Sequence, residues 1–315
     1  MKKTTIIFIF LLLSANFDAY AFWIWSPKTK KWKNPQYSAL ATPYLQYREA
    51  LKHFENKDYK KAYKEFKKLL IHYPDAKKAA EAQYYLGLCL EELGKPYDAF
   101  LEYQKVIDSY PNSTHINEVV ERQYHIGEHF LNRSPKRWLG VSYYDFVDHP
   151  AIEIFTRIVE KTPYSPYASK AQYKLGLLFL KLGRYEEARD AFQKVTDSYP
   201  DSQWAIPAKY QLAITIAKIF PGEDYDSSPI EEAQKRLDEF IQAHPDAEIS
   251  SVAEEQLDTL RNKEAKKNFE IAEFYARQQK FNAARIYYEV VVKNYPESQY
   301  AQEAHSKLRE LKDTQ

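Results

Sequence analysis

Apolar residues recur along the chain in amphipathic segments, and six of these segments end at a proline. The prolines are Pro74, Pro111, Pro163, Pro200, Pro245 and Pro296. Proline lacks a backbone N–H and disfavours the helical conformation of the residue before it, so we expect a helix to end at each site. The intervals between these prolines are 37, 52, 37, 45 and 51 residues. The two shortest intervals are equal and close to the length of a tetratricopeptide-type repeat of two helices.

Three apolar positions precede each of these prolines at fixed distances. Twelve residues before the proline stands an alanine: Ala62, Ala99, Ala151, Ala188, Ala233 and Ala284. Eight residues before it stands a large residue: Phe66, Tyr103, Phe155, Phe192, Leu237 and Tyr288. Five residues before it stands another: Leu69, Val106, Ile158, Val195, Phe240 and Val291. Because the three positions lie on one face of a helix, they predict the buried face of the second helix in each repeat.

The first helix of each repeat is marked by one small residue. These residues are Ala50, Gly87, Gly127, Gly176, Ala213 and Ala272. Two antiparallel helices approach closely only where small residues lie at their crossing point, and larger side chains fill the space beside it. This combination is typical of the tetratricopeptide repeat (TPR). We therefore predict an all-α, TPR-like solenoid of helical hairpins with about six repeats.

Repeats three and five are longer than the others. Their extra residues fall within 131–150 and within 218–229, between the two helices of each repeat. No Gly or Pro occurs between residues 249 and 280, which indicates either one long helix or two nearly continuous helices joining repeats five and six. Residues 297–311 are expected to form a capping helix. Repeats one to three then occupy 44–163, and repeats four to six with the capping helix occupy 164–311.

The N-terminus has the features of a signal peptide. Two lysines precede the apolar run Ile6–Leu13, which is too short to span a bilayer, and Ala19–Ala21 resembles a cleavage site. We expect residues 1–21 to be removed and the protein to be exported to the periplasm; a buried first strand or a retained anchor helix is the alternative. Residues 22–43 hold three Trp and three Pro without a period, so we expect them to be irregular or extended.

Charge and cysteine content exclude several classes of function. Without residues 1–21 the chain has 43 basic and 43 acidic residues, which argues against bulk electrostatic binding of nucleic acid or anionic lipid. Cys89 is the single cysteine and lies in an apolar helical stretch, so we interpret it as a buried, inert thiol. No cysteine follows the apolar run of the signal peptide, and we therefore expect no lipid anchor.

One motif resembles a metalloenzyme signature. Residues His125–His129 read His-Ile-Gly-Glu-His, an inverted zinc-protease pattern that places two His on one helix face. Ile126 and Gly127, however, occupy packing positions of repeat three. Repeat packing thus explains this helix without a metal, and no phosphate-binding loop or nucleophile elbow is present in the sequence. We expect no catalytic residues, no metal and no cofactor.

The repeats also point to a family. The chain resembles the BamD family over about residues 43–311. The resemblance is carried by the signal peptide, the middle insertions, the long late helix and four short segments: Tyr97–Phe100, Tyr110–Ser113, Tyr185–Ala188 and Tyr199–Ser202. That family is the TPR component of the machinery that assembles outer-membrane proteins in Gram-negative bacteria.

The resemblance implies a periplasmic scaffold that binds a BamA-like barrel-forming assembly protein and unfolded outer-membrane proteins. Family members carry a lipid on an N-terminal cysteine, which this sequence does not show. Interfacial contact through Phe22–Trp25 is one alternative way to reach the membrane. A generic TPR adaptor for cell-envelope or peptidoglycan machinery is the alternative function, and sugar binding through exposed Trp is a third.

Two sets of residues are candidates for binding partners. An aromatic residue stands three positions before each small residue of the first helices: Tyr47, Tyr84, Tyr124, Tyr173, Tyr210 and Phe269. Stacked repeats would arrange these rings as a ladder along a peptide-binding groove, or the rings pack between neighbouring helices instead. The insertion of repeat three contributes basic and aromatic residues typical of interface anchors: Arg133, Lys136, Arg137 and Trp138. The alternative for this loop is packing against its own repeats.

Overall fold

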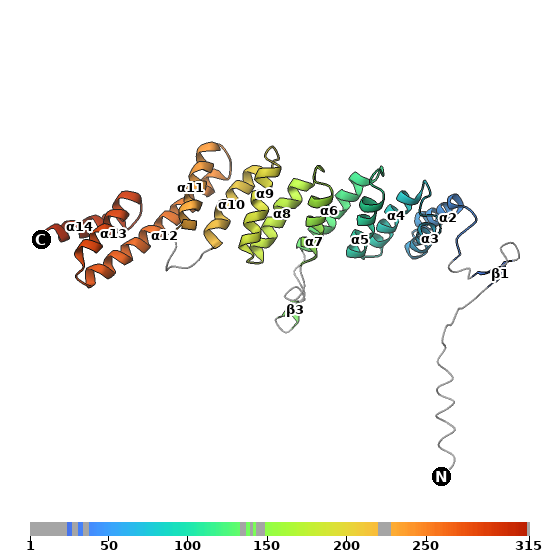
Figure 1. The fold of residues 1–315 in the computed structure, drawn as a ribbon, viewed down its shortest axis with the longest axis horizontal. Helices are drawn as coiled ribbons and strands as arrows, with labels where there is room; N and C mark the ends of the chain where they lie inside the picture. Colours follow the sequence, from blue (N-terminus) through green and yellow to red (C-terminus); the bar gives the residue numbers. More distant parts are fainter. Residues whose placement is uncertain are drawn as a thin grey trace, which may run out of the picture. The chain divides into compact units, whose positions relative to one another are not determined.

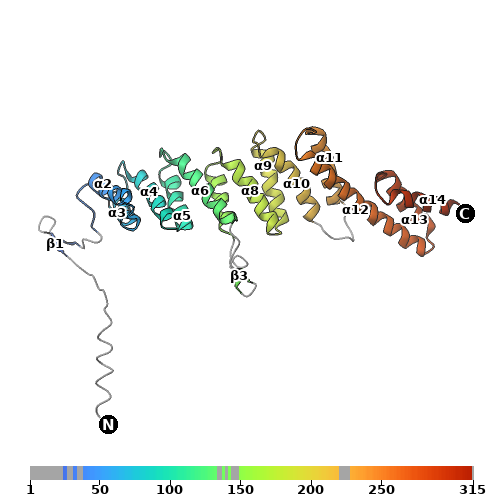
Figure 2. The ribbon, with the colours of Figure 1, turned by 180° about the vertical axis from the view of Figure 1, so that it is seen from behind.

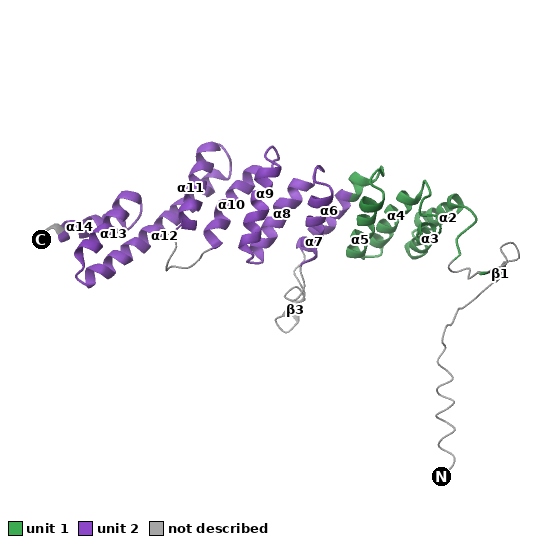
Figure 3. Cartoon of the chain, in the orientation of Figure 1, with its two compact units in different colours: residues 1–119 green, residues 120–315 purple. Residues whose placement is uncertain are grey.

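The computed structural model describes residues 24–26, 31–33, 38–132, 137–138, 141–142, 149–219 and 228–313. The predicted signal peptide lies outside these ranges. The chain forms two compact units, residues 1–119 and residues 120–315, with the boundary inside one helix (Figure 3). The sequence-based division of the repeats at residue 163 stays a prediction.

The first unit consists of helical hairpins preceded by a short strand pair. Strands β1 (Ile24–Ser26) and β2 (Lys31–Lys33) pair antiparallel. The helices are α2 (Pro43–Glu55), α3 (Tyr59–His72), α4 (Ala79–Glu92), α5 (Pro96–Ser109) and the first turn of α6 (Ile116–Asn132). From α2 to α5, each helix packs against the next one in the chain. The predicted segment 22–43 thus contains an extended hairpin.

The second unit is also built of helical hairpins (Figures 1 and 2). After α6 come β3 (Arg137–Trp138), β4 (Val141–Ser142), α7 (Pro150–Lys161), α8 (Ala168–Lys181), α9 (Tyr185–Ser198), α10 (Ala205–Ile219), α11 (Ser228–Ala243), α12 (Ser250–Arg277), α13 (Phe281–Asn294) and α14 (Ala301–Asp313). Each helix from α7 to α14 packs against its neighbour in the chain. The all-α, TPR-like solenoid of helical hairpins is confirmed. No helix in the described ranges is both long and apolar enough to cross a membrane.

Burial follows the predicted register in all six repeats. Ala188, Phe192 and Val195 are fully buried on α9, and the equivalent positions of the other second helices are at most 3% exposed. The small residues of the first helices are buried as well. Helix hairpins stabilise one another by burying these faces, so the proline-based register describes the core correctly.

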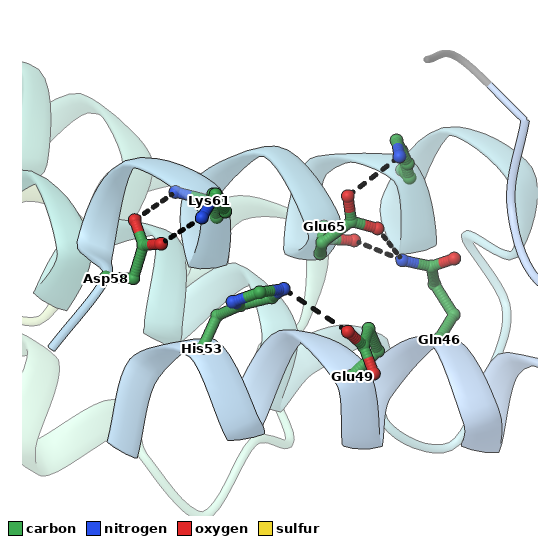
Figure 4. A network of polar contacts seen from close by, with 7 residues as sticks. Gln46, Glu49, His53, Asp58, Lys61 and Glu65 are labelled. Atoms are coloured by element: carbon green, nitrogen blue, oxygen red, sulfur yellow. Dashed lines mark hydrogen bonds and ion pairs between the residues drawn. The ribbon is translucent and has the colours of Figure 1, made fainter. Parts of the chain in front are cut away.

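Buried glutamines of the first helices donate hydrogen bonds to the second helices. Gln46 Nε2 donates to the Glu65 carbonyl oxygen at 3.0 Å and to its carboxylate at 2.8 Å. Gln83 and Gln172 make the same bond to a carbonyl nineteen residues later, each at 3.0 Å. Figure 4 shows the first of these contacts beside other polar contacts of repeat one, including that of His53 with Glu49. A buried amide that donates to a carbonyl of the facing helix restricts the rotation of one helix against the other.

Where the first helix carries glycine, the partner helix leaves no room for a side chain. A Cβ atom added at Gly176 would lie 2.6 Å from Cε1 of the Phe192 ring, well inside van der Waals contact. The Phe192 ring of α9 therefore lies directly against the backbone of α8 at Gly176. In repeat five the equivalent positions hold a different pair, Ala213 and Leu237, which belong to one core cluster.

Gly176→Ala is expected to lower the free energy of unfolding by about 1–3 kcal/mol, because the methyl group overpacks against Phe192. Urea denaturation followed by circular dichroism measures the change. Adding Phe192→Leu, which copies the pair of repeat five, should recover part of the loss. If Gly176→Ala leaves stability unchanged, the two helices are less closely packed than described.

Candidate protein-binding surface

The six rings of the predicted ladder are buried. Their exposed fractions run from 0% for Tyr124 to 9% for Tyr173 and Tyr210. Each ring contacts an aromatic ring of the second helix in its own repeat, as Tyr124 does with Phe155 at a centroid distance of 5.8 Å. This burial favours the packing alternative, and direct contact between these rings and a peptide stays a hypothesis.

A second residue covers each ring from the turn before the next first helix. These covering residues stand four positions after each repeat-ending proline: Lys78, His115, Tyr167, Trp204, Ile249 and Tyr300. His115 stacks on Tyr84 with ring centroids 4.4 Å apart and planes 6° from parallel. Lys78 is exposed and the other five are half-buried. These residues do not follow the hydrophobic pattern and were not predicted, although their fixed distance from the proline is a usable signal.

In the second unit, these contacts join into one aromatic–lysine cluster, formed by Tyr124, Tyr167, Lys170, Tyr173 and Trp204. The Tyr124 and Tyr167 rings are 5.2 Å apart, and the Tyr173 and Trp204 rings 5.1 Å. Lys170 connects the two pairs, since its ammonium lies 4.5 Å from the Tyr124 centroid and 5.9 Å from that of Trp204. The cluster therefore extends from α6 through α8 to the turn before α10.

Carboxylates balance the charge of this cluster. Glu128 accepts a hydrogen bond of 2.7 Å from the Tyr124 hydroxyl and lies 4.0 Å from Lys170 and 3.8 Å from Lys174. Burial, and then the bond to Glu128, raises the pKa of Tyr124 far above its ordinary value, so this hydroxyl remains a neutral donor.

Glu121 accepts a hydrogen bond from the Tyr167 hydroxyl, as Glu128 does from Tyr124. Burial, and then a hydrogen bond to Glu121, raises the pKa of Tyr167. Two lysines, Lys170 and Lys174, are thus matched by two glutamates in the same region. An aromatic surface with balanced charges suits a polypeptide better than a small anion, because stacking and hydrogen bonding dominate over net charge.

The His-Ile-Gly-Glu-His sequence occupies one turn of α6. Ile126 and Gly127 are buried, as the repeat register predicts, whereas His125 and His129 are exposed. His125 lies 3.6 Å from Glu128 and 3.9 Å from Glu121. Across the described ranges, His, Cys, Asp and Glu side chains form no group of three that could hold a metal ion.

The predicted partner-contact loop lies mostly outside the described residues. Arg133 and Lys136 fall in that part of the chain. Arg137 and Trp138 form β3, where Arg137 is paired with Ser142 and Trp138 with Val141. A contact between these four residues and a partner protein stays a prediction.

Family models match two parts of the chain. The model described as outer membrane lipoprotein, YfiO, matches residues 144–312, and a tetratricopeptide-repeat model matches residues 81–113. Neither description names a catalytic activity, in keeping with a protein-interaction scaffold. No curated protein matches the chain significantly.

Several solved structures resemble the chain at low sequence identity. The C-terminal part of a TPR repeat-containing protein from Cytophaga hutchinsonii is 18% identical over 84% of this chain and 87% of its own, with a TM-score of 0.36. A tetratricopeptide repeat protein from Parabacteroides merdae is 15% identical over 85% and 98%, with a TM-score of 0.32. PilF from Pseudomonas aeruginosa is 16% identical over 84% and 97%, with a TM-score of 0.30.

Proposed function

Since the chain belongs to the YfiO family of outer membrane lipoproteins, we propose that it is a periplasmic scaffold for the assembly of outer-membrane proteins. In this role it binds a BamA-like barrel-forming assembly protein and unfolded segments of outer-membrane proteins. The observation that carries the proposal is the family match itself. It covers residues 144–312, and four of the five residues of the aromatic–lysine cluster lie inside it.

The aromatic–lysine cluster supports binding of an extended, aromatic-rich segment. Tyr167 and Trp204 are half-buried, so each keeps part of its ring accessible while resting on a buried tyrosine. Rigid aromatic side chains provide large contact area at low entropic cost. The buried ladder rings thus support the binding surface from beneath, and the covering residues contact the bound peptide.

Lys170 supplies the polar element of this surface. Its ammonium lies between two rings and 4.0 Å from Glu128, where it can donate to a carbonyl or carboxylate oxygen of a bound peptide. Because the surrounding charges balance, such contacts orient the peptide and add little long-range attraction.

The insertion of repeat three is the proposed contact for the barrel-forming protein. Its residues Arg133, Lys136, Arg137 and Trp138 combine positive charge with an aromatic ring. Arg and Trp are enriched among residues that dominate the free energy of protein–protein binding. The two proposed surfaces would allow one protein to hold a substrate and the assembly machinery together.

Tyr167→Ala combined with Trp204→Ala is expected to weaken binding of a peptide from the C-terminal strand of an outer-membrane barrel at least tenfold, about 1.4 kcal/mol. Fluorescence anisotropy of a labelled peptide measures this. The matched control is Tyr164→Ala, since Tyr164 lies in the turn before α8, as Tyr167 does, and is fully exposed.

An unchanged peptide affinity in the double variant, with the fold intact by circular dichroism, would remove the cluster as the binding surface. Co-purification from envelope extracts tests the wider role. Recovery of the barrel-forming protein supports the assembly scaffold. Recovery of peptidoglycan enzymes without it would favour the generic adaptor.

A further inference from the structure

The continuous helix α12 changes the junction at the start of repeat six. In repeat two, the Tyr110 hydroxyl donates a hydrogen bond of 3.3 Å to the carbonyl oxygen of Pro74, in the turn that precedes the first helix. In repeat six, residues 259–263 of α12 stand at the same distances before the small residue of the first helix as residues 74–78 do in repeat two. Because a helix replaces the turn, the carbonyl oxygens of these residues accept helical hydrogen bonds instead. The tyrosine equivalent to Tyr110 is Tyr295.

Two hydroxyl groups at this junction have no internal partner. The Tyr295 hydroxyl makes no hydrogen bond within the described part of the chain, and burial raises the pKa of Tyr295, so the group remains a neutral donor. Ser298 is 8% exposed, and its Oγ has no partner among the described residues. Ser165 and Ser202 share this feature at the equivalent positions of repeats three and four, but they are less deeply buried. A buried hydroxyl without a partner costs free energy, so these groups favour a ligand that can pair with them.

Both hydroxyls belong to residues that line a cleft between α12 and the turn from α13 to α14. The cleft has a volume of about 640 Å³. The Asn262 side-chain oxygen Oδ1 accepts a hydrogen bond of 3.2 Å from the backbone N–H of Gln299, which holds the turn against α12. Sites for small molecules usually measure about 300–1,000 Å³ and are formed before the ligand binds. The cleft therefore has the size and the fixed walls of a small-molecule site.

The charged residues that line this cleft balance one another. Asp258 and Glu297 are acidic, and Arg261 and Lys293 are basic. Arg261 is paired with Asp238 at 3.0 Å, and the other three form no ion pair within the described ranges. An anion would be attracted by an excess of positive charge, which the cleft lacks. The described His, Cys, Asp and Glu side chains also form no group of three for a metal ion. The lining therefore favours a neutral, polar ligand.

We propose that this cleft binds a neutral saccharide of one or two rings. Sugar hydroxyls both donate and accept hydrogen bonds, so they can pair with the hydroxyls of Tyr295 and Ser298 and with the carboxylates and amides around them. The half-buried Tyr295 ring and Pro296 offer apolar surface to the C–H face of a sugar ring. An extended peptide requires a longer groove than one helix and one turn provide. This inference is independent of peptide binding by the aromatic–lysine cluster.

Isothermal titration calorimetry on the chain lacking residues 1–21 tests the proposal, with cellobiose, maltose and di-N-acetylchitobiose as probes. We expect at least one of these disaccharides to bind with a Kd of about 1 mM or below. Tyr295→Phe with Ser298→Ala should weaken that binding at least tenfold, because the variant loses both hydroxyls and keeps the ring. Since neither hydroxyl is bonded within the described protein, the free energy of unfolding should not fall.

The matched control is Tyr110→Phe with Ser113→Ala, which removes the equivalent hydroxyls of repeat two. It should bind the saccharide like the unchanged protein. Absence of binding for all three probes, or equal losses in the control and test variants, would overturn the proposal. Tighter binding of inorganic phosphate than of any disaccharide would identify an anion site and also overturn it. So would a loss of affinity for the outer-membrane barrel peptide in the Tyr295→Phe and Ser298→Ala variant, because that result would assign the cleft to polypeptide.

Discussion

Tyr124→Ala is expected to lower the free energy of unfolding by about 3–5 kcal/mol, the usual cost of removing a large buried aromatic side chain. Tyr124 is 0% exposed and contacts the rings of Phe155 and Tyr167 and the ammonium of Lys170. Its loss leaves a cavity between α6 and α7. Urea denaturation followed by circular dichroism measures the change, and repeats three and four should melt first because each repeat depends on its neighbours.

Tyr124→Phe is the matched control. It keeps the ring and removes only the hydroxyl that donates to Glu128 at 2.7 Å. A hydrogen bond to a charged group contributes about 1.5–3 kcal/mol, so we expect a loss smaller than that of Tyr124→Ala. If Tyr124→Ala instead keeps full stability and loses peptide binding, the ladder rings line a peptide-binding groove. That is the first of the two alternatives predicted from the sequence.

Periodicity located the ladder but could not decide whether its rings are exposed. The exposure of Tyr84 depends on His115, and that of Tyr173 on Trp204, both of which stand in turns that begin the next repeat. The covering position is occupied by Lys, His, Tyr, Trp, Ile and Tyr in succession. A position whose residue type varies this much has no hydrophobic period. Its fixed distance from the proline marks the position in the sequence, but the folded chain is needed to show that the residue there covers the ring.

The core, in contrast, was predictable from the sequence in every repeat. A helix crossing admits only small residues, and the proline ends the second helix, so packing fixes residue size at defined distances. Gly176 and Ala188 are therefore recognisable from the sequence alone. The position of the Lys170 side chain was not predictable, because neighbouring rings and charges determine where a long, flexible side chain lies.

Helix α12, which joins repeats five and six, is another feature that the sequence alone did not decide. The sequence left open whether 249–280 forms one helix or two, and the structure has one helix of 28 residues, Ser250–Arg277. Its first half contributes Leu257 to a core cluster with α10 and α11. Its second half contributes Phe269 to a separate cluster with α13 and α14. A continuous helix therefore links two cores that do not share side chains.

Lys263→Pro is expected to break this link and to cost at least about 3 kcal/mol. Lys263 is exposed and lies between the two clusters, so its side chain adds little to either core. A proline there removes the backbone hydrogen bond to residue 259 and its ring clashes with that carbonyl group. The second half of α12 with α13 and α14 should then open independently, and limited proteolysis with intact mass measurement should detect cleavage near residue 263.

Lys263→Ala separates the effect of proline from the loss of the lysine. Alanine has the highest helix propensity, so this variant should be as stable as the unchanged protein or slightly more stable. Its proteolysis pattern should also stay unchanged. Should Lys263→Pro resist cleavage and melt as one transition with the rest of the chain, the two core clusters are coupled through contacts other than α12. Loss of the C-terminal fragment alone, with residues 43–243 still folded, would identify α12 as the element that connects repeat six to the solenoid.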